Sequence, residues 1–357
     1  MYIRKYGLHK LIEVLSIMLL LSMLAGCTHG DDDIPKIVLT SGFAKDEIFR
    51  IENQSCTLPE IMVYLTNIQD QYEDVYGDRI WDTKIDGVSL ENNIKDMTLS
   101  KIAQVKAINL LADQKRISLN DDELQKVTDA TDRYWSSLSA AEIEAMGIDR
   151  DVILKLYTEY AVSEKLYQEI IKDINPEISD DEARRITVEH ILIKTYTLDE
   201  NGNRQKCTEY AKQLALQKAN EALERAKAGE DFERLAEEYS DDLTLTYSFG
   251  KSEMDAVFEN AAFNLGNGEI SDIIETEYGY HIIKCLSTFN KEETDSNKYQ
   301  IVEKRRNEAF TEEYNEFVST LTKNLNTELW DEVTFSRDPR VKTCNFFEIF
   351  DEYWNGD

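Results

Sequence analysis

The chain has 357 residues, a formal net charge of -30 at pH 7 and 42% hydrophobic residues. This length is too great for one ordinary hydrophobic core and supports two domains. The strong negative charge repels phosphate backbones and anionic lipid, which excludes a nucleic-acid-binding protein.

The first 27 residues have the features of an export signal. Basic residues precede an apolar run of about a dozen residues, which is typical of a secretory signal peptide and too short for a comfortable membrane span. The run ends in "LAGC", which resembles the bacterial lipobox. The resemblance implies a signal peptide over residues 1–26, lipidation of Cys27 and a tether over 27–35. An uncleaved anchor with an incidental cysteine is the alternative.

Cysteine usage adds little. Apart from Cys27 the chain has Cys56, Cys207, Cys285 and Cys344, with no CxxC or other close spacing. Export permits disulfides, and four cysteines allow three pairings. Idle thiols are the expected state.

Residues 36–178 are predicted to be helical. Apolar residues at helical spacing predict helices over 92–114 and 139–146, another opening at Asn120, and a fourth beginning after Asp149. Glu123 follows Asn120 by three residues, which is a capping-box arrangement. None of these helices carries a catalytic signature.

The pattern changes at Ser179. The stretch "RITVEHILIKTYT" predicts a strand, and a loop, helices and short strands alternate after it as far as residue 289. The final strands are expected around "SDII" and "YGYHIIKCL". This mixed order predicts a compact α+β domain of about 110 residues.

Residues 290–357 begin with a polar link that includes "KEETDSN" and continue into one long helix and an aromatic-rich tail. The middle domain already looks complete, so it cannot bury the apolar stripe of this long helix. We therefore expect the last helix and the tail to pack on the N-terminal helices, which makes residues 179–289 an insert.

Three stretches carry a family resemblance: "VEHILIK", "GEDFERLAEEYSDD" and "MDAVFENAAFNLGNGEISDIIETEYGYHIIK". Together they cover most of a domain that resembles the parvulin-type peptidyl-prolyl isomerases. The implied fold is a small, mostly antiparallel sheet with surrounding helices, inserted in an all-helical chaperone-like domain. The layout of the whole chain is similar to the PrsA and SurA class of exported foldases.

The resemblance also implies a site. It places paired histidines on adjacent central strands, an acidic residue facing the prolyl bond, and apolar residues around the proline ring. The implied residues are His190, Asp242 and His281 as catalytic groups and Met254, Phe258, Thr276 and Tyr278 as substrate-binding groups. Asp241 is the neighbour that could be confused with Asp242.

Two expectations concern the chemistry of this site. Each histidine can donate from one nitrogen and accept at the other, so the pair is expected to fix each other's tautomers. Partial desolvation is expected to raise the pKa of Asp242. No cofactor is implied, and the absence of HxxxH, HxH or a third nearby histidine argues against a metal.

The expected function is that of a lipid-anchored isomerase acting on unfolded or newly exported proteins with Xaa-Pro bonds. Its expected location is the extracytoplasmic face of the cell membrane. The alternative is a non-catalytic holdase with a degenerate insert, because "LTLTYSFGKSE" is shorter than the glycine-rich segment of many parvulins. The oligomeric state stays open, a homodimer included.

Overall fold

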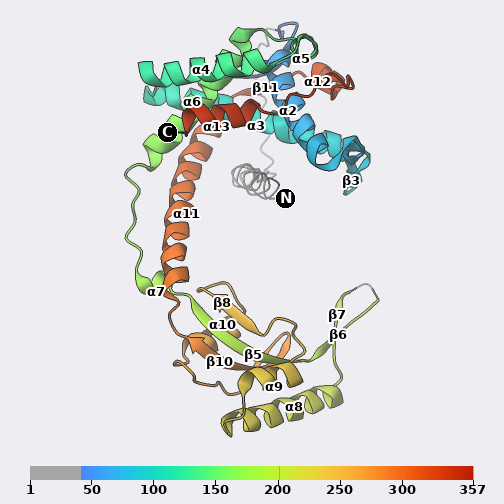
Figure 1. Cartoon of the computed structure of the whole chain (residues 1–357), viewed down its shortest axis with the longest axis vertical. Helices are drawn as coiled ribbons and strands as arrows, with labels where there is room; N and C mark the ends of the chain where they lie inside the picture. Colours follow the sequence, from blue (N-terminus) through green and yellow to red (C-terminus); the bar gives the residue numbers. More distant parts are fainter. Residues whose placement is uncertain (1–41, 201, 357) are drawn as a thin grey trace. The chain divides into compact units, whose positions relative to one another are not determined.

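The structure, a computed structural model, describes residues 42–200 and 202–356. The expected signal peptide, Cys27 and the tether lie outside the described residues. The chain divides into two compact units, coloured by sequence position in Figure 1. We call residues 42–173 with 308–356 the helical unit and residues 174–307 the central unit.

Local hydrogen bonds set the ends of the helices in the helical unit. Asn120 and Ser139 each head a capping box, and Asp149 accepts a hydrogen bond from Val152 N–H. The four helices expected from the sequence are present, and the capping box at Asn120 is confirmed. The helices are α2 (Leu58–Tyr76), α3 (Leu90–Lys115), α4 (Asp121–Ser137), α5 (Ala140–Met146), α6 (Arg150–Ile171), α12 (Thr327–Glu332), α13 (Phe346–Trp354), the end of α11 (Lys291–Val318) and the 3-10 helix η1 (Asp78–Asp82).

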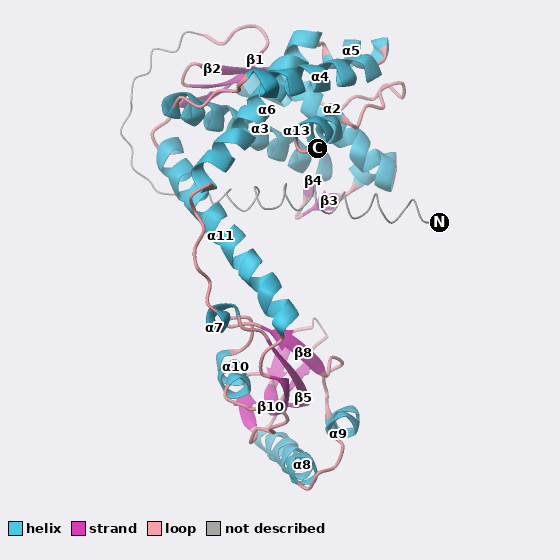
Figure 2. Ribbon diagram, turned by 60° about the vertical axis from the view of Figure 1, so that its left-hand side comes forward, coloured by secondary structure: helices cyan, strands magenta, loops and turns pink. Residues whose placement is uncertain are grey.

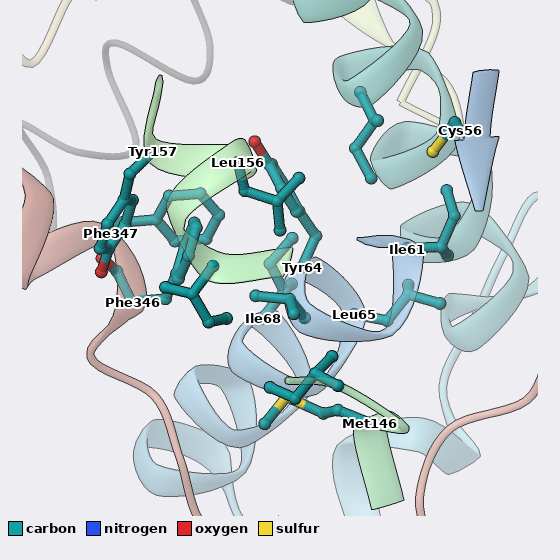
Figure 3. Close-up of a cluster of buried hydrophobic side chains, with 14 of the residues drawn as sticks. Cys56, Ile61, Tyr64, Leu65, Ile68, Met146, Leu156, Tyr157, Phe346 and Phe347 are labelled. Carbon is teal, nitrogen blue, oxygen red and sulfur yellow. The ribbon is translucent and has the colours of Figure 1, made fainter. Parts of the chain in front are cut away.

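Aromatic side chains from both ends of the sequence fill the core of this unit (Figure 3). The rings of Tyr157 and Phe346 stack at 4.4 Å between centroids, and the Tyr157 hydroxyl donates to the Phe346 carbonyl oxygen at 2.7 Å. Tyr64 packs edge-on against Phe347 at 5.3 Å. Helices α2, α6 and α13 therefore share one core, and each fully buried aromatic contributes about 2 kcal/mol through removal of its surface from water.

The helical unit also contains strands, so the expectation of an all-helical domain is wrong in this detail. An antiparallel sheet has the order β11-β1-β2, and β3 pairs with β4 in a separate hairpin. These strands were not predicted because they are too short to show a clear alternation of apolar and polar residues. In addition, β11 pairs with β1 across most of the chain length, so no local pattern indicates it. Their bounds are β1 (Glu47–Ile51), β2 (Gln54–Thr57), β3 (Lys84–Ile85), β4 (Val88–Ser89) and β11 (Lys323–Leu325).

The central unit has the expected α+β fold. Its antiparallel sheet has the order β8-β5-β10-β9, which places β5 and β10 at the centre. One face of the sheet packs on α8 and α9 through residues such as Ile191 and Ile282, and the other packs on α10 through Val188 and Ile283 (Figure 2). The elements are β5 (Ile186–Lys194), β8 (Thr246–Phe249), β9 (Ile274–Thr276), β10 (Gly279–Ser287), α7 (Asp180–Ala183), α8 (Glu209–Lys227), α9 (Phe232–Tyr239) and α10 (Ala256–Phe263).

Three local expectations for this unit were wrong. The stretch expected as a loop contains a hairpin of β6 (Tyr196–Leu198) and β7 (Arg204–Lys206). The strand expected around "SDII" lies slightly later, as β9. The polar stretch expected as a link is the first part of α11, where the Asn290 side chain accepts from Glu293 N–H and starts the helix.

The described residues hold neither a disulfide nor a membrane-crossing helix. Cys56, Cys207, Cys285 and Cys344 are all free thiols. Across residues 42–200 and 202–356, every helix is too short or too polar to cross a bilayer.

Candidate active site

The central strands bring His190 and His281 together. In the antiparallel register of β5 and β10, His190 lies opposite Ile283 and His281 lies opposite Leu192, so the two histidines are diagonal neighbours on one face of the sheet. Their rings lie nearly parallel, at 19°, with centroids 5.7 Å apart. Both side chains are almost fully buried.

Gly279 allows this register. Its φ is 144°, and a Cβ on this residue would lie 2.1 Å from the Ile193 carbonyl oxygen. Any larger residue would push β10 away from β5 two residues before His281.

His190 faces two acceptors through one nitrogen. Its Nε2 lies 3.1 Å from the Thr244 carbonyl oxygen and 3.4 Å from Asp242 Oδ2. Because a carbonyl can only accept, His190 carries its proton on Nε2. The proton is therefore held on the side of Asp242.

His281 is held from the opposite side. Its Nε2 lies 2.8 Å from Thr276 Oγ1, and the same oxygen accepts from Tyr278 N–H at 3.1 Å. The Thr276 hydroxyl can either donate to or accept from His281 Nε2, so this contact orients the ring with either tautomer.

The histidines do not fix each other's tautomers as expected. Among the described residues each ring has its own partner, and the buried Nδ1 atoms of His190 and His281 lack any hydrogen-bond partner. The expectation is wrong because the rings lie face to face, so their nitrogens do not point at one another.

Burial keeps both imidazoles neutral. Desolvation lowers the pKa of His190 below its ordinary value, although Thr244 and Asp242 act in the other direction. Desolvation, together with the nearby His190, lowers the pKa of His281 to about 4. The pair is therefore uncharged at neutral pH.

Asp242 is ionised rather than protonated. Desolvation acts to raise its pKa, but hydrogen bonds from Thr244 N–H and the Tyr247 hydroxyl, and the proximity of His190, outweigh it, so the pKa lies below its ordinary value. The expectation of a raised pKa is wrong because it considered burial without these donors.

Asp241 points elsewhere. Its Oδ2 accepts from Lys194 N–H at 2.9 Å, and its Oδ1 lies 3.9 Å from Lys218 Nζ. The structure thus places Asp242, and not Asp241, beside the histidines.

Phe258 forms a wall of the site. Its ring lies edge-on to both histidines, 5.7 Å from His190 and 5.2 Å from His281 between centroids. Met254 packs against the same apolar cluster and remains partly exposed. Both residues therefore lie on the side of the sheet where the histidines lie.

Tyr278 does not reach the histidines. Its backbone positions Thr276, but its ring lies beneath the Arg204 guanidinium, 4.4 Å from the ring centroid, on the side of the β6–β7 hairpin. Thr276 meets the site through its side chain, and Tyr278 through its backbone N–H.

Sequence reasoning missed Tyr247. Its hydroxyl donates to Asp242 Oδ2 at 3.0 Å, and its ring lies edge-on to His190 at 5.1 Å. The sequence alone gave no signal for it, because Tyr247 approaches Asp242 only when β8 borders β5. Its spacing from Asp242 carries no meaning until that strand is placed.

Ligands for a metal are not assembled in the described part of the chain. Residues 42–200 and 202–356 contain no group of three or more histidine, cysteine or acidic side chains arranged to hold an ion. The arrangement can instead present one carboxylate, two neutral imidazoles and an apolar wall to a peptide.

Parts of the chain match a known domain family and known proteins. Residues 190–287 match the family model described as a PPIC-type PPIase, or rotamase, domain. Foldase protein PrsA of Caldanaerobacter subterraneus is 25% identical over 291 residues, which cover 76% of this chain and 85% of the relative. The protein of the same name from Clostridium botulinum is 24% identical over 302 residues, covering 75% and 84%. That of Geobacillus kaustophilus is 36% identical over 120 residues, covering 32% and 43%. The chain therefore carries a PPIC-type (parvulin) peptidyl-prolyl isomerase domain, and over about three quarters of its length it is similar to the PrsA foldases.

Proposed function

We propose that this protein is exported, is anchored by a lipid on Cys27, and isomerises Xaa-Pro bonds of newly exported proteins at His190, Asp242 and His281. The observation that carries the proposal is the meeting of an ionised Asp242 with two neutral, buried histidines beside Phe258. A carboxylate and two imidazoles that are grouped beside apolar side chains are commonly part of a functional site.

The chemistry required is rotation without bond cleavage. Resonance holds the Xaa-Pro amide planar, with a barrier of about 20 kcal/mol and partial negative charge on its oxygen. An ionised carboxylate near that oxygen repels the charge of the planar form, and the twisted form carries less of it. Asp242 then favours the twisted state.

The other groups support that role. Phe258 and Met254 exclude water from the proline ring, which strengthens the field of Asp242. The two neutral histidines hold the walls of the site without adding positive charge that would cancel this field. His190 keeps Asp242 in place through its Nε2 proton.

Export and anchoring rest on the sequence of the first 27 residues. Basic residues, a short apolar run and a final "LAGC" form a lipoprotein signal. Two acyl chains on Cys27 give stable anchoring, where one chain is marginal.

A second candidate function is holding of unfolded clients by the helical unit. Large apolar side chains are exposed around the end of α2, the β3–β4 hairpin and α3, which is unusual for a surface with no partner. They are Val75, Tyr76, Ile85, Val88 and Met97. In this proposal residues 36–178 and 290–357 form the chaperone-like part and residues 179–289 form the catalytic insert.

The isomerase site is tested with neighbouring aspartates. In a cis/trans assay on an Xaa-Pro peptide, Asp242→Asn in the chain without residues 1–27 is expected to lower kcat/KM by about 100-fold, since a charge acting on the twisted amide is removed. The matched control is Asp241→Asn, which loses a carboxylate directed at Lys194 and is expected to retain activity within about threefold.

Equal losses in the two variants would refute the role of Asp242.

The holdase function is tested with the double variant His190→Ala and Asp242→Ala. This variant should still suppress client aggregation, because the proposed holding surface lies in the helical unit. Loss of suppression in that folded double variant would count against a separate holding surface.

Anchoring is tested at Cys27. In a bacterial host, the wild-type chain should incorporate labelled fatty acid and fractionate with membranes. Cys27→Ser should incorporate none, because the thiol that carries the lipid is absent. Cys56→Ser is the control, since that cysteine is buried in the helical unit. Label on the Cys27→Ser protein would disprove the proposed anchor.

A further inference from the structure

We infer that Tyr247 is a positioning residue for the isomerase reaction, acting by holding the Asp242 carboxylate against His190. The inference rests on the proposed function of Asp242 and deepens it. Asp242 lies in the loop that joins α9 to β8, residues 240–245.

The Tyr247 hydroxyl makes the closest contact to the Asp242 carboxylate. It donates to Oδ2 at 3.0 Å, whereas Thr244 N–H reaches Oδ1 at 3.3 Å and His190 Nε2 reaches Oδ2 at 3.4 Å. A hydrogen bond to an ionised group is worth more than one between neutral groups. Tyr247 thus provides the principal restraint on the direction of this side chain.

The Tyr247 ring is itself fixed by the sheet. Tyr247 pairs with Val188 across β8 and β5, two residues before His190 on the same strand. Its ring lies edge-on to His190 at 67°, with centroids 5.1 Å apart. The ring and the hydroxyl therefore contact both members of the Asp242–His190 pair, and a shift of one is transmitted to the other.

Titratable groups from several elements lie around the Asp242–His190–His281 site. His190 from β5 and Tyr247 from β8 act on Asp242 directly, whereas Asp242 and Asp255, at the start of α10, both act on His281 of β10. Only Tyr247 combines a direct hydrogen bond with a side chain that stays neutral through the pH range of the assay, because its own pKa is raised by desolvation and by Asp242.

The test is Tyr247→Phe in the full chain, purified in detergent, with kcat/KM for an Xaa-Pro peptide measured from about pH 2.5 to pH 8, a range that includes the titration of Asp242. The variant keeps the ring on His190 and removes the hydroxyl. We expect kcat/KM at pH 7 to fall about tenfold. The acid limb of the profile should move up by about half a pH unit to one unit, because Asp242 is easier to protonate without its donor.

Tyr239→Phe is the matched control. Its hydroxyl also donates to a carboxylate, Glu221 Oε1 at 2.7 Å, but on the helical side of the sheet away from the histidines. This variant loses the same kind of hydrogen bond and should change neither kcat/KM nor the acid limb. Acid unfolding at a higher pH would also move the limb, so circular dichroism over the same pH range must show that each variant stays folded.

A double-mutant cycle separates positioning from a merely structural role. If Tyr247 acts through Asp242, Tyr247→Phe should change kcat/KM by less than about twofold in an Asp242→Asn background. A Tyr247→Phe profile like that of Tyr239→Phe, or the same loss in both backgrounds, would overturn the inference and leave the proposed function standing. A wild-type chain without isomerase activity would refute the proposed function, and the inference with it.

Discussion

At the scale of single residues, Asp70 in α2 is the most unusual titratable group outside the site. Its side chain is 3% exposed, and its Oδ2 has no hydrogen-bond partner. Desolvation raises its pKa to about 7, with Glu73 and Asp74 adding to the shift and Lys342 opposing it. The folded protein therefore holds a proton there that the unfolded chain releases near pH 4.

This raised pKa predicts a pH-dependent stability. Between about pH 4 and pH 7 the unfolded state loses the proton first, so the contribution of Asp70 to stability falls as pH rises and is constant above that range. Asp70→Asn should raise the free energy of unfolding at pH 8 by on the order of 3 kcal/mol, with no gain at pH 4. Urea unfolding at the two pH values measures this.

The control for Asp70 is Asp74→Asn on the same helix. A gain of the same size in the control, or a gain for Asp70→Asn that is equal at pH 4 and pH 8, would show that general charge reduction is responsible.

The same scale shows what the sequence could reveal about the site. His190 and His281 were identifiable because each stands in a motif typical of the family, and the sheet places them together. The ionisation of Asp242 was not predictable, because it depends on donors from Thr244 and Tyr247 that no spacing indicates. Family motifs located the residues, and the fold determined their charge.

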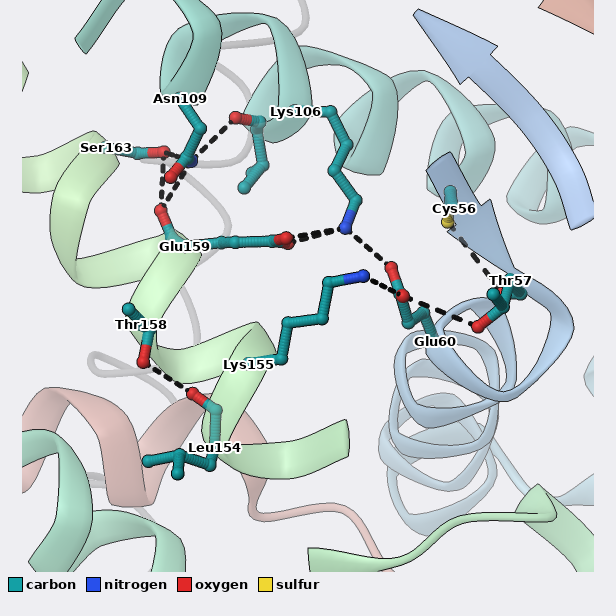
Figure 4. Close-up of polar contacts among 11 residues, drawn as sticks. Cys56, Thr57, Glu60, Lys106, Asn109, Leu154, Lys155, Thr158, Glu159 and Ser163 are labelled. Carbon is teal, nitrogen blue, oxygen red and sulfur yellow. Dashed lines mark hydrogen bonds and ion pairs between the residues drawn. The ribbon is translucent and has the colours of Figure 1, made fainter. Parts of the chain in front are cut away.

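At the scale of elements, one buried ionic cluster joins three helices (Figure 4). Lys106 of α3 is fully buried, with Nζ 2.6 Å from Glu60 Oε2 of α2 and 2.7 Å from Glu159 Oε1 of α6. Lys155 adds a contact to Glu60 Oε1 at 2.5 Å. Two bases and two acids make the cluster neutral, which permits its burial.

Lys106→Met should therefore destabilise the helical unit strongly. It leaves two buried carboxylates without their common partner, and the expected loss is about 3 to 5 kcal/mol in the free energy of unfolding. Lys155→Met is the control, since that side chain is 44% exposed and should cost about 1 kcal/mol or less. Chemical unfolding followed by circular dichroism compares them, and similar losses would refute a special role for Lys106.

The elements also differ in how well local sequence specified them. Helices α4 and α5 were predictable because each begins with a capping box, which is recognisable within four consecutive residues. Strand β11 was not, because it becomes a strand only by pairing with β1, where Phe49 lies opposite Leu325. Local signals specify helices, whereas a short strand depends on a distant partner.

At the scale of the whole molecule, the chain leaves the helical unit after residue 173 and returns at residue 308. Within that unit the two ends lie close together, since the Tyr167 ring of α6 is 5.2 Å from the Phe310 ring of α11. Leu166, Ile171 and Tyr314 belong to the same buried cluster. The helical unit therefore keeps this cluster without residues 174–307.

Excision of residues 174–307 tests whether the helical unit folds by itself. A short Gly-Ser linker from Asp173 to Glu308 should give a chain that unfolds cooperatively, because all its core clusters lie outside the excised segment. It should lack isomerase activity and still suppress client aggregation. Removal of residues 174–318 is the control. It also deletes Phe310 and Tyr314, and each large buried aromatic that is lost should cost about 3 to 5 kcal/mol. If both shortened chains unfold alike, the helical unit depends on the central one; if only the longer excision does, the central unit is an insert in a self-sufficient fold.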